Sequence, residues 1–377
     1  MEPVEVAIIG GGIVGCACAR ELARAGHSVT LFEAGSEVAA DTSCRAMGHI
    51  GIYDESEAQL ALSALARSTW DEISTDLPPP VEYIRRGSLW LARESRELEE
   101  AARKQGRLRQ RGIEAQLLDS EAVYRAEPNV RAGLAGALLV PGDAVIDTTA
   151  ATRYLAESAR RAGAVVRTRT AVARLEPEAL ELASGERVRA TTIVLAAGWQ
   201  SPKLLPALPI RPRKGHIIRT AARPGFIRHN LSEIGYMAET RPTAGDSISL
   251  VVQPRASGQY LLGATRQYAG SSLEVDPRVI EALRRTVEEF VPGFADLPTE
   301  STWTGLRPAG PDSVPIIGRW PTSPRWIVAA GHEGIGITTS LATGRLVAEI
   351  VDHRTPSIPL APYSAERLSL GRAAPSD

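Results

Sequence analysis

The 377-residue sequence predicts a mixed α/β protein with one parallel sheet and a second, antiparallel sheet. Three observations lead to this prediction. A short apolar strand, a glycine-rich turn, a helix and a second strand follow one another within the first 33 residues. A continuous apolar run at 192–198 is typical of a strand buried on both faces. Between 210 and 265, short apolar runs alternate with glycines and prolines, which favours antiparallel strands.

The composition narrows the class of protein. Apolar residues make up 44% and charged residues 23% of the chain, which is ordinary for a globular protein. The formal net charge is -1, so the chain lacks the excess of basic residues that is typical of nucleic-acid-binding proteins. No apolar run is long enough to span a bilayer. The N-terminus lacks the basic residues of a signal peptide, so we expect a cytosolic protein. We expect Cys16, Cys18 and Cys44 to be small buried apolar residues, and we expect no metal site.

The first element is a dinucleotide-binding motif. Residues 4–9 (VEVAII) form a strand, GGGIVG opens a helix that ends at Gly26, and residues 28–33 (SVTLFE) form a second strand. In such a unit the first glycine makes the tight turn and the second lets the backbone approach a pyrophosphate. The third glycine allows close packing of helix on strand, and the helix N-terminus offers free N–H groups to the phosphates.

These residues predict a Rossmann-type domain. An acid at the end of the second strand can accept hydrogen bonds from a ribose 2′-OH, which disfavours NADP and leaves NAD or FAD. The predicted cofactor contacts are Gly10, Gly12, Ile13, Val14, Gly15, Glu33 and Ala34.

A polar segment after the second strand favours FAD. Residues 40–51 read ADTSCRAMGHIG, and a helical stretch at 57–77 and a stiff Pro-Pro-Pro break follow, where a NAD-type domain usually continues into further βα units. The pattern resembles the D-amino-acid oxidase family of FAD enzymes, which includes glycine oxidase and sarcosine oxidase. The resemblance implies that this segment lies along the FAD pyrophosphate and reaches the isoalloxazine. The matching residues are Thr42, Ser43, Arg45, Met47, Gly48 and His49. Arg45 stands where some relatives attach FAD covalently through histidine, so the resemblance implies non-covalent FAD.

The middle of the chain continues with predicted strands and helices, part of which returns to the FAD-binding domain. We expect strands at 87–92, 165–168, 171–175 and 186–190, a helix at 148–163, and a solvated surface helix at 94–111. The run IVLAAG resembles the second strand of the family that contacts FAD, under the adenosine and pyrophosphate. The contacts that it implies are Val172, Ala196, Ala197, Gly198 and Trp199.

A second domain is expected after Ile210. Residues 210–216 (IRPRKGH) resemble the family element at which the chain enters the substrate domain. Strands at 217–220, 248–253 and 259–263 and a helix at 276–290 follow, and residues 251–265 resemble the hairpin that covers the flavin. The predicted FAD-binding domain comprises 1–80, 145–209 and 300–377. The predicted α+β substrate domain comprises 81–144 and 210–299.

Residues 303–318 (WTGLRPAGPDSVPIIG) carry the most specific part of the resemblance. Arg307 falls on the arginine that grips the substrate carboxylate in relatives such as glycine oxidase. A guanidinium fork matches a carboxylate bidentately, so this role is chemically sound. The alternative is that Arg307 pairs with a structural acid such as Asp312.

The chain ends with a strand at 326–331, a glycine-rich loop and a helix at 337–351. The resemblance points this helix N-terminus at the N1–C2=O edge of the flavin, where N–H groups and the helix dipole stabilise negative charge. Glycines let that backbone lie close. The predicted contacts from this part of the chain are Gly305, Gly331, His332, Gly334, Ile335, Gly336, Ile337 and Thr338.

The same loop departs from the glycine-oxidase pattern. Those proteins carry a second arginine where this chain has Gly334, so a two-arginine grip is lost. Glu333 either holds the substrate amine or caps the last helix. His49 and His332 are candidates for contact with flavin or substrate and neither is predicted to be a base. A structural role is the alternative for His49.

The sequence HEGIGITTS resembles that of a narrower group of flavin β subunits. These belong to dye-linked D-hydroxyproline and proline dehydrogenases, opine oxidases and hydrogen cyanide synthase. This resemblance implies oxidation of an amino or imino acid by hydride transfer from Cα–H to flavin N5. Electrons would then pass to an acceptor or to partner subunits with further redox centres, which could hold the chain at the inner membrane. The catalytic candidates are Arg307, His49 and Glu333.

Two alternatives remain for the function. One is a self-sufficient glycine, sarcosine or D-amino-acid oxidase that makes hydrogen peroxide, which the missing second arginine disfavours. The other is a non-catalytic subunit that holds FAD, which the presence of Arg307 disfavours. The tail after Pro356 is expected at the surface or partly disordered.

Overall fold

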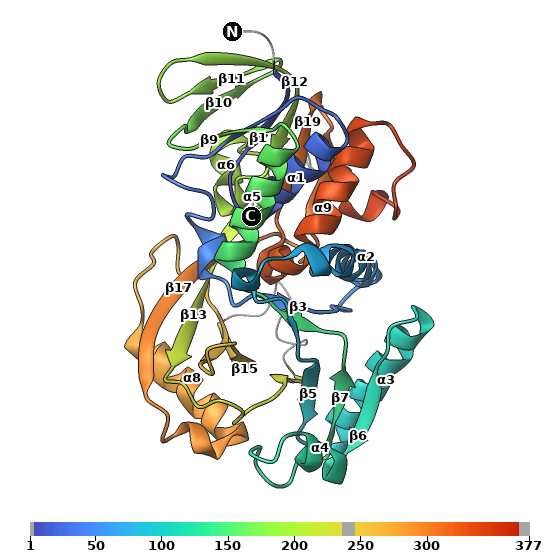
Figure 1. Cartoon of the computed structure of the whole chain (residues 1–377), viewed down its shortest axis with the longest axis vertical. Coiled ribbons are helices and arrows are strands. Elements are labelled where there is room, and N and C mark those ends of the chain that lie inside the picture. The colour runs from blue at the N-terminus through green and yellow to red at the C-terminus, as the bar shows by residue number, and fades with distance from the viewer. Residues whose placement is uncertain (1–3, 236–245, 369–377) are drawn as a thin grey trace, which may run out of the picture.

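The computed structural model describes residues 4–235 and 246–368, which form two large sheets at opposite ends of an elongated molecule (Figure 1). The first sheet has the strand order β10-β11-β12-β1-β2-β9, with β19 paired to β12 and β18 paired to β19. Its centre is parallel, as predicted, because β19, β12, β1, β2 and β9 all run in one direction. The strands are β1 (Val4–Ile9), β2 (Val29–Phe32), β9 (Val165–Arg167), β10 (Val172–Glu176), β11 (Ala179–Leu182), β12 (Arg187–Leu195), β18 (Ile316–Trp320) and β19 (Ser323–Ala330).

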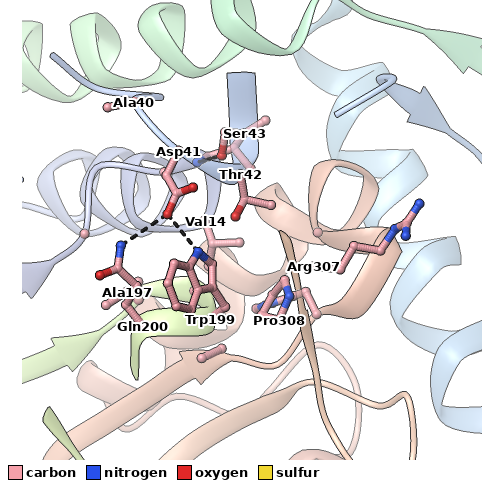
Figure 2. A pocket seen from close by; sticks show the side chains of 18 of the residues that line it. Val14, Ala40, Asp41, Thr42, Ser43, Ala197, Trp199, Gln200, Arg307 and Pro308 are labelled. Atoms are coloured by element: carbon pink, nitrogen blue, oxygen red, sulfur yellow. Dashed lines mark hydrogen bonds between the residues drawn. The ribbon is translucent and has the colours of Figure 1, made fainter. Parts of the chain in front are cut away.

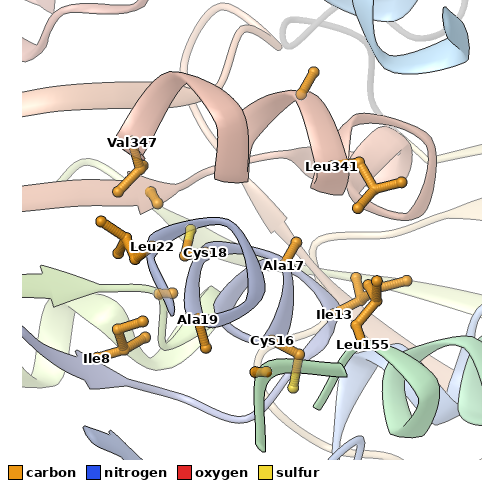
Figure 3. Packing of buried hydrophobic residues seen from close by; sticks show 14 of the residues in the cluster. Ile8, Ile13, Cys16, Ala17, Cys18, Ala19, Leu22, Leu155, Leu341 and Val347 are labelled. Atoms are coloured by element: carbon orange, nitrogen blue, oxygen red, sulfur yellow. The ribbon is translucent and has the colours of Figure 1, made fainter. Parts of the chain in front are cut away.

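Three helices cover this sheet, namely α1 (Ile13–Arg24), α5 (Thr148–Arg161) and α9 (Gly336–Val351). A fourth helix, α2 (Glu57–Ile73), packs on α9. Helix α1 packs against both α9 and α5. Figure 3 shows Cys18 and Leu22 of α1 on the side of α9, and Cys16 on the side of α5 with Leu155. Cys16 and Cys18 are fully buried, as predicted, whereas Cys44 is exposed.

The second sheet has the order β17-β13-β16-β15-β14-β5-β7-β6. It is antiparallel, as predicted, except that β14 and β5 run parallel. Helix α8 (Pro277–Phe290) packs on β15 and β16, and α3 (Ser95–Gln110) and α4 (Ser120–Ala126) pack on β7. The strands are β5 (Ser88–Ala92), β6 (Gln116–Asp119), β7 (Gly136–Val140), β13 (Arg211–Thr220), β14 (Asn230–Glu233), β15 (Ser247–Pro254), β16 (Tyr260–Arg266) and β17 (Thr299–Ala309). A small third sheet joins β3 (His49–Ile50), β8 (Ala144–Val145) and β4 (Ile84–Arg85).

Several elements differ from the sequence prediction. The two strands expected at 186–190 and 192–198 are one strand, β12, because its first half pairs with β11 and its second half with β1. Helix α2 ends at Ile73 and a 3-10 turn follows. The tail is not all at the surface, since Tyr363 is 1% exposed and donates to the carbonyl of Ala58. The part of the tail beyond residue 368 lies outside the described residues.

The division into two domains stays a prediction. Every strand of the first sheet comes from the segments assigned to the FAD-binding domain. Strand β17 begins at Thr299 and belongs to the second sheet, although the prediction assigned residues from 300 onwards to the first domain. Across residues 4–235 and 246–368, no helix combines the length and the apolar character needed to cross a membrane.

His27 ties strand β1 to the residues that follow helix α9. It lies between α1 and β2, and its Nδ1 and Nε2 are each 2.6 Å from a carboxylate oxygen, of Glu5 in β1 and of Asp352 after α9. Partial burial lowers the pKa of His27, but the hydrogen bonds to the two carboxylates raise it further, so the net direction is upward.

The first prediction concerns the contact between α1 and α9. A Cβ added at Gly344 would lie 2.7 Å from the carbonyl oxygen of Ala17. Gly344→Ala should lower the free energy of unfolding by about 1–2 kcal/mol, because overpacking outweighs the gain in helix propensity. Urea unfolding measures this. Gly106→Ala, at an open position of α3, is the control and should stabilise by about 1 kcal/mol. Equal effects of the two changes would contradict the prediction.

The second prediction concerns pH. His27→Gln should lower the free energy of unfolding by about 1 kcal/mol or less at about pH 6, the usual size for a partly exposed ion pair. Because the folded pKa of His27 is raised, its contribution is complete below the ordinary histidine value and is lost as pH rises through the raised value. Urea unfolding of both proteins up to about pH 9 should show the difference shrinking. A difference independent of pH would refute this assignment.

Candidate functional site

A cavity of about 460 Å³ lies between the two large sheets. One wall is formed by residues at the carboxyl ends of the parallel strands, among them Ile9 of β1, Phe32 of β2 and Ala330 of β19. The other wall comes from β13 and β17 of the second sheet. The carboxyl ends of parallel strands are where open α/β sheets bind their ligands.

The glycine turn after β1 has the geometry that its sequence predicts. Gly10 has a φ of +110°, and a Cβ there would lie 2.5 Å from the carbonyl oxygen of Ala196. A Cβ at Gly15 would lie 1.9 Å from the carbonyl oxygen of Gly10, so α1 sits directly on the turn. Glu33 directly follows β2 beside this turn, and its carboxylate accepts from the backbone N–H groups of Gly11 and Gly35, each at 2.6 Å.

The segment 40–47 runs along the cavity and is held from two sides. The hydroxyl of Ser43 accepts from the N–H of Ile13 at 3.0 Å, at the start of α1. The hydroxyl of Thr42 donates to the carbonyl of Leu306 at 2.8 Å, and the indole of Trp303 donates to the carbonyl of Arg45 at 3.1 Å, both from β17. This segment therefore links the first sheet to the second beside the cavity.

Arg307 of β17 lies at the end of the cavity next to the glycine-rich loop. Its guanidinium donates to the carbonyl of Thr265 at 2.8 Å and packs over Gly215, where a Cβ would lie 2.5 Å from Nη1. A Cβ at Gly334 would lie 3.5 Å from its Nε. Asp312 pairs with Arg367 instead, at 2.8 and 3.2 Å, so the alternative pairing of Arg307 with Asp312 is wrong.

Glu333 lies in the same part of the cavity wall and is nearly buried. One of its oxygens is 3.8 Å from Nη1 of Arg213 and 3.8 Å from Nε of Arg266. Burial raises the pKa of Glu333, but Arg266, Arg307 and Arg213 lower it further, so the carboxyl group is ionised near neutral pH. The N-cap residue of α9 is Ile335, which makes no side-chain cap hydrogen bond, and Glu333 accepts from the N–H of Gly334 in the 3-10 turn that directly precedes the helix.

The two histidine candidates have different surroundings. His332 lines the cavity, and its Nε2 is 3.0 Å from the hydroxyl of Thr343; burial lowers its pKa to about 3, so it is neutral. His49 does not line the cavity. Its ring is 2.8 Å from the hydroxyl of Ser88 and 3.2 Å from that of Tyr53, which supports a structural role. Its carbonyl accepts from the hydroxyl of Thr338 at 2.7 Å.

Most of the predicted contacts line one cavity. Those that do are Gly10, Gly12, Ile13, Val14, Glu33, Ala34, Thr42, Ser43, Arg45, Met47, Val172, Ala196, Ala197, Gly198, Trp199, Gly305, Arg307, His332, Glu333, Gly334, Gly336 and Ile337. Those that do not are Gly15, Gly48, His49, Gly331, Ile335 and Thr338.

The sequence prediction missed a further set of lining residues. Ile9 and Phe32 could have been found from their places at or next to the ends of predicted strands. Asp41, Gln200 and Lys203 carry no motif. The missed residues are Ile9, Phe32, Ala40, Asp41, Ala46, Ala171, Ala173, Gln200, Lys203, Leu204, Gly215, Ile217, Pro308, Ala329 and Ala330.

The cavity fits the FAD that the resemblance implies. It extends from Val172 of β10 to Arg307 of β17, and two helices, α1 and α9, begin at its wall. Helix N-termini offer N–H groups and a positive dipole end to phosphates and to an electron-rich ring edge. The glycines at both helix starts leave the backbone accessible, as a close-lying dinucleotide requires.

Comparison with known proteins agrees with this geometry. The family model described as FAD dependent oxidoreductase (DAO) matches residues 5–350. The D-amino acid dehydrogenase of Cereibacter sphaeroides is 28% identical to this chain, over 97% of this chain and 95% of its own length. The D-amino acid dehydrogenase of Methylobacterium radiotolerans is also 28% identical, over 98% of this chain and 100% of its own length.

Solved structures show the same fold. Glycine oxidase from Geobacillus kaustophilus has a TM-score of 0.86 at 26% identity, over 97% of this chain and 98% of that one. L-proline dehydrogenase from P. horikoshii has a TM-score of 0.88 at 22% identity, over 99% and 100%, which is a likeness of fold alone.

The family match spans nearly all of the chain and agrees with the cavity that the sequence motifs build. FAD is the cofactor of this family, and the D-amino acid dehydrogenases and the glycine oxidase compared above are named for the oxidation of amino acids. The chain is therefore an FAD-dependent amino-acid dehydrogenase or oxidase and belongs to the DAO family of FAD-dependent oxidoreductases.

Proposed function

We propose that the chain oxidises an amino or imino acid of the D-hydroxyproline, proline or opine type and passes the electrons to an acceptor or a partner subunit. The observation that carries this proposal is Arg307, whose guanidinium stands at the cavity wall between β13 and the glycine-rich loop. Bound FAD supplies the chemistry by accepting a hydride from the substrate Cα–H. The residues of the chain bind and orient the substrate.

Arg307 anchors the substrate carboxylate. Its contacts with Thr265 and Gly215 fix the guanidinium in one orientation, which reduces the entropy lost when a substrate binds. A planar fork of N–H donors then holds a carboxylate bidentately and sets the direction of the Cα–H bond.

Glu333 holds the substrate amine. Its carboxylate stays ionised because three arginines lie around it, and it stands next to Gly334, which approaches Arg307. An amino acid carries its ammonium and its carboxylate on one carbon. Its ammonium can therefore bind Glu333 while its carboxylate binds Arg307. After oxidation the imine product hydrolyses in water.

A self-sufficient oxidase is the second candidate. The similarity to glycine oxidase at 26% identity and a TM-score of 0.86 favours it. Two features favour the dehydrogenase. The position of the second arginine of that pattern is Gly334 here, and the ionised Glu333 disfavours negative charge developing on oxygen at this end of the cavity.

The third prediction tests the anchor. Arg307→Ala should weaken substrate binding and slow anaerobic flavin reduction, together by roughly 10–100-fold, the usual loss for a charged hydrogen bond. Stopped-flow absorbance at the flavin band, with D-proline, D-hydroxyproline, glycine, sarcosine and an opine, measures both quantities. Arg367→Ala is the matched control, because Arg367 binds Asp312 outside the cavity. If the flavin of the Arg307 variant were reduced at the wild-type rate, the proposal would lose its basis.

The fourth prediction separates the two candidates. The substrate-reduced protein should be re-oxidised slowly by air and rapidly by an artificial electron-accepting dye. Glu333→Gln should speed re-oxidation by air, because it removes a negative charge beside the site. Stopped-flow mixing of reduced protein with air-saturated buffer measures the rate. Fast re-oxidation of the unmodified protein by air would favour the oxidase.

A further inference from the structure

We propose that Asp41 closes a clasp across the FAD cavity, and that opening of this clasp controls the rates of FAD uptake and release. One carboxylate oxygen of Asp41 accepts two hydrogen bonds, from the indole N–H of Trp199 at 2.8 Å and from the side-chain amide of Gln200 at 3.2 Å. Figure 2 shows these bonds joining the segment of Thr42 and Ser43 to the turn after β12. Asp41 and both of its partners line the cavity.

The clasp completes a closed ring of contacts within the wall of the cavity. On one side the N–H of Ala196 donates to the carbonyl of Ile9 at 2.9 Å, where β12 and β1 end together. At the start of α1, the N–H of Ile13 donates to the hydroxyl of Ser43 at 3.0 Å. The chain runs from Ser43 back to Asp41, and the clasp returns the ring to the segment after Ala196.

Every residue that makes these contacts lines the cavity. The lining of the cavity also includes Val172 and Arg307, which are not part of the ring. The clasp therefore bridges two segments of the wall that a ligand in this cavity must pass, and its opening widens the path for that ligand.

The clasp is the part of the ring that can open most easily. The contact between Ala196 and Ile9 continues a strand ladder, and the contact at Ser43 uses a backbone N–H of α1. The clasp joins side chains only, and its members are partly exposed. Thr42 and Arg45 hold their segment to β17 independently, so loss of the clasp leaves the segment in place.

The proposal concerns FAD, which is established by family membership, and does not depend on the substrate proposed above. Its test measures flavin fluorescence during release of FAD on dilution of the holoprotein, and flavin fluorescence during binding of FAD by the apoprotein. Asp41→Ala should speed both steps, release by roughly tenfold, the size expected for hydrogen bonds to a charged acceptor. Loss of an ordinary contact with FAD would speed release alone.

Conservative variants distinguish the clasp from a general disturbance. Asp41→Asn keeps a side-chain oxygen acceptor and should release FAD more slowly than Asp41→Ala. Trp199→Phe keeps an aromatic ring and removes the indole donor, so it should speed release. The double variant Asp41→Ala with Trp199→Phe should be no faster than Asp41→Ala, because both changes break one contact.

Glu37→Ala is the matched control. Glu37 is an acid of the same loop, and it binds Arg153 at 2.5 Å away from the cavity, so its removal should leave both rates unchanged. Wild-type rates of FAD binding and release in Asp41→Ala would overturn the proposal. It would also be overturned if the effects of Asp41→Ala and Trp199→Phe on the release rate multiplied in the double variant. If Asp41→Ala does not fold, the comparison of Asp41→Asn and Trp199→Phe, singly and combined, decides the question in the same way.

Discussion

The close approach of α1 to α9 is the constraint on which the cavity depends. Gly344 of α9 lies against the backbone of Ala17, so the two helices meet without an intervening side chain. Each helix begins at the cavity wall, α1 just after Gly12 and α9 at Gly336. Two positive helix ends therefore converge on one ligand, although their sequences lie more than three hundred residues apart. Glycine stands at each helix start, Gly12 before α1 and Gly336 in α9, and the lack of a side chain there leaves the backbone accessible to the cofactor.

The second sheet uses glycine for a different purpose. Gly215 of β13 and Gly305 of β17 are paired across the sheet, next to the pair formed by Arg213 and Arg307. A Cβ at Gly215 would collide with the guanidinium of Arg307, so its absence leaves room for that side chain to lie over the strand. Side chains of neighbouring strands in antiparallel register interact directly, which is how one glycine determines the position of an arginine on the next strand.

The sequence was sufficient for the local parts of the structure. The glycine turn, the acid after β2 and the helix start of α9 could be predicted because each is defined within a few residues. The clasp of Asp41 with Trp199 could not be predicted, because 158 residues separate the partners and a lone Asp in a polar loop has no specific signal. The placement of β17 in the second sheet also depends on pairing with β13, which spacing along the chain does not encode.

Charge around the glycine-rich loop completes the account of the site. The chain lacks the second arginine of the glycine-oxidase pattern at Gly334, yet Arg213 of β13 and Arg266 of β16 reach the same loop from the second sheet. Their field keeps Glu333 ionised against the cost of burial. The result is an anion fixed near a cation, Glu333 near Arg307. A zwitterionic amino acid presents the complementary pair of charges, with its ammonium and carboxylate on one carbon. The arrangement thus favours a ligand with both charges over a simple carboxylate, because the latter would bring its negative charge beside Glu333 without the ammonium that a zwitterion places there.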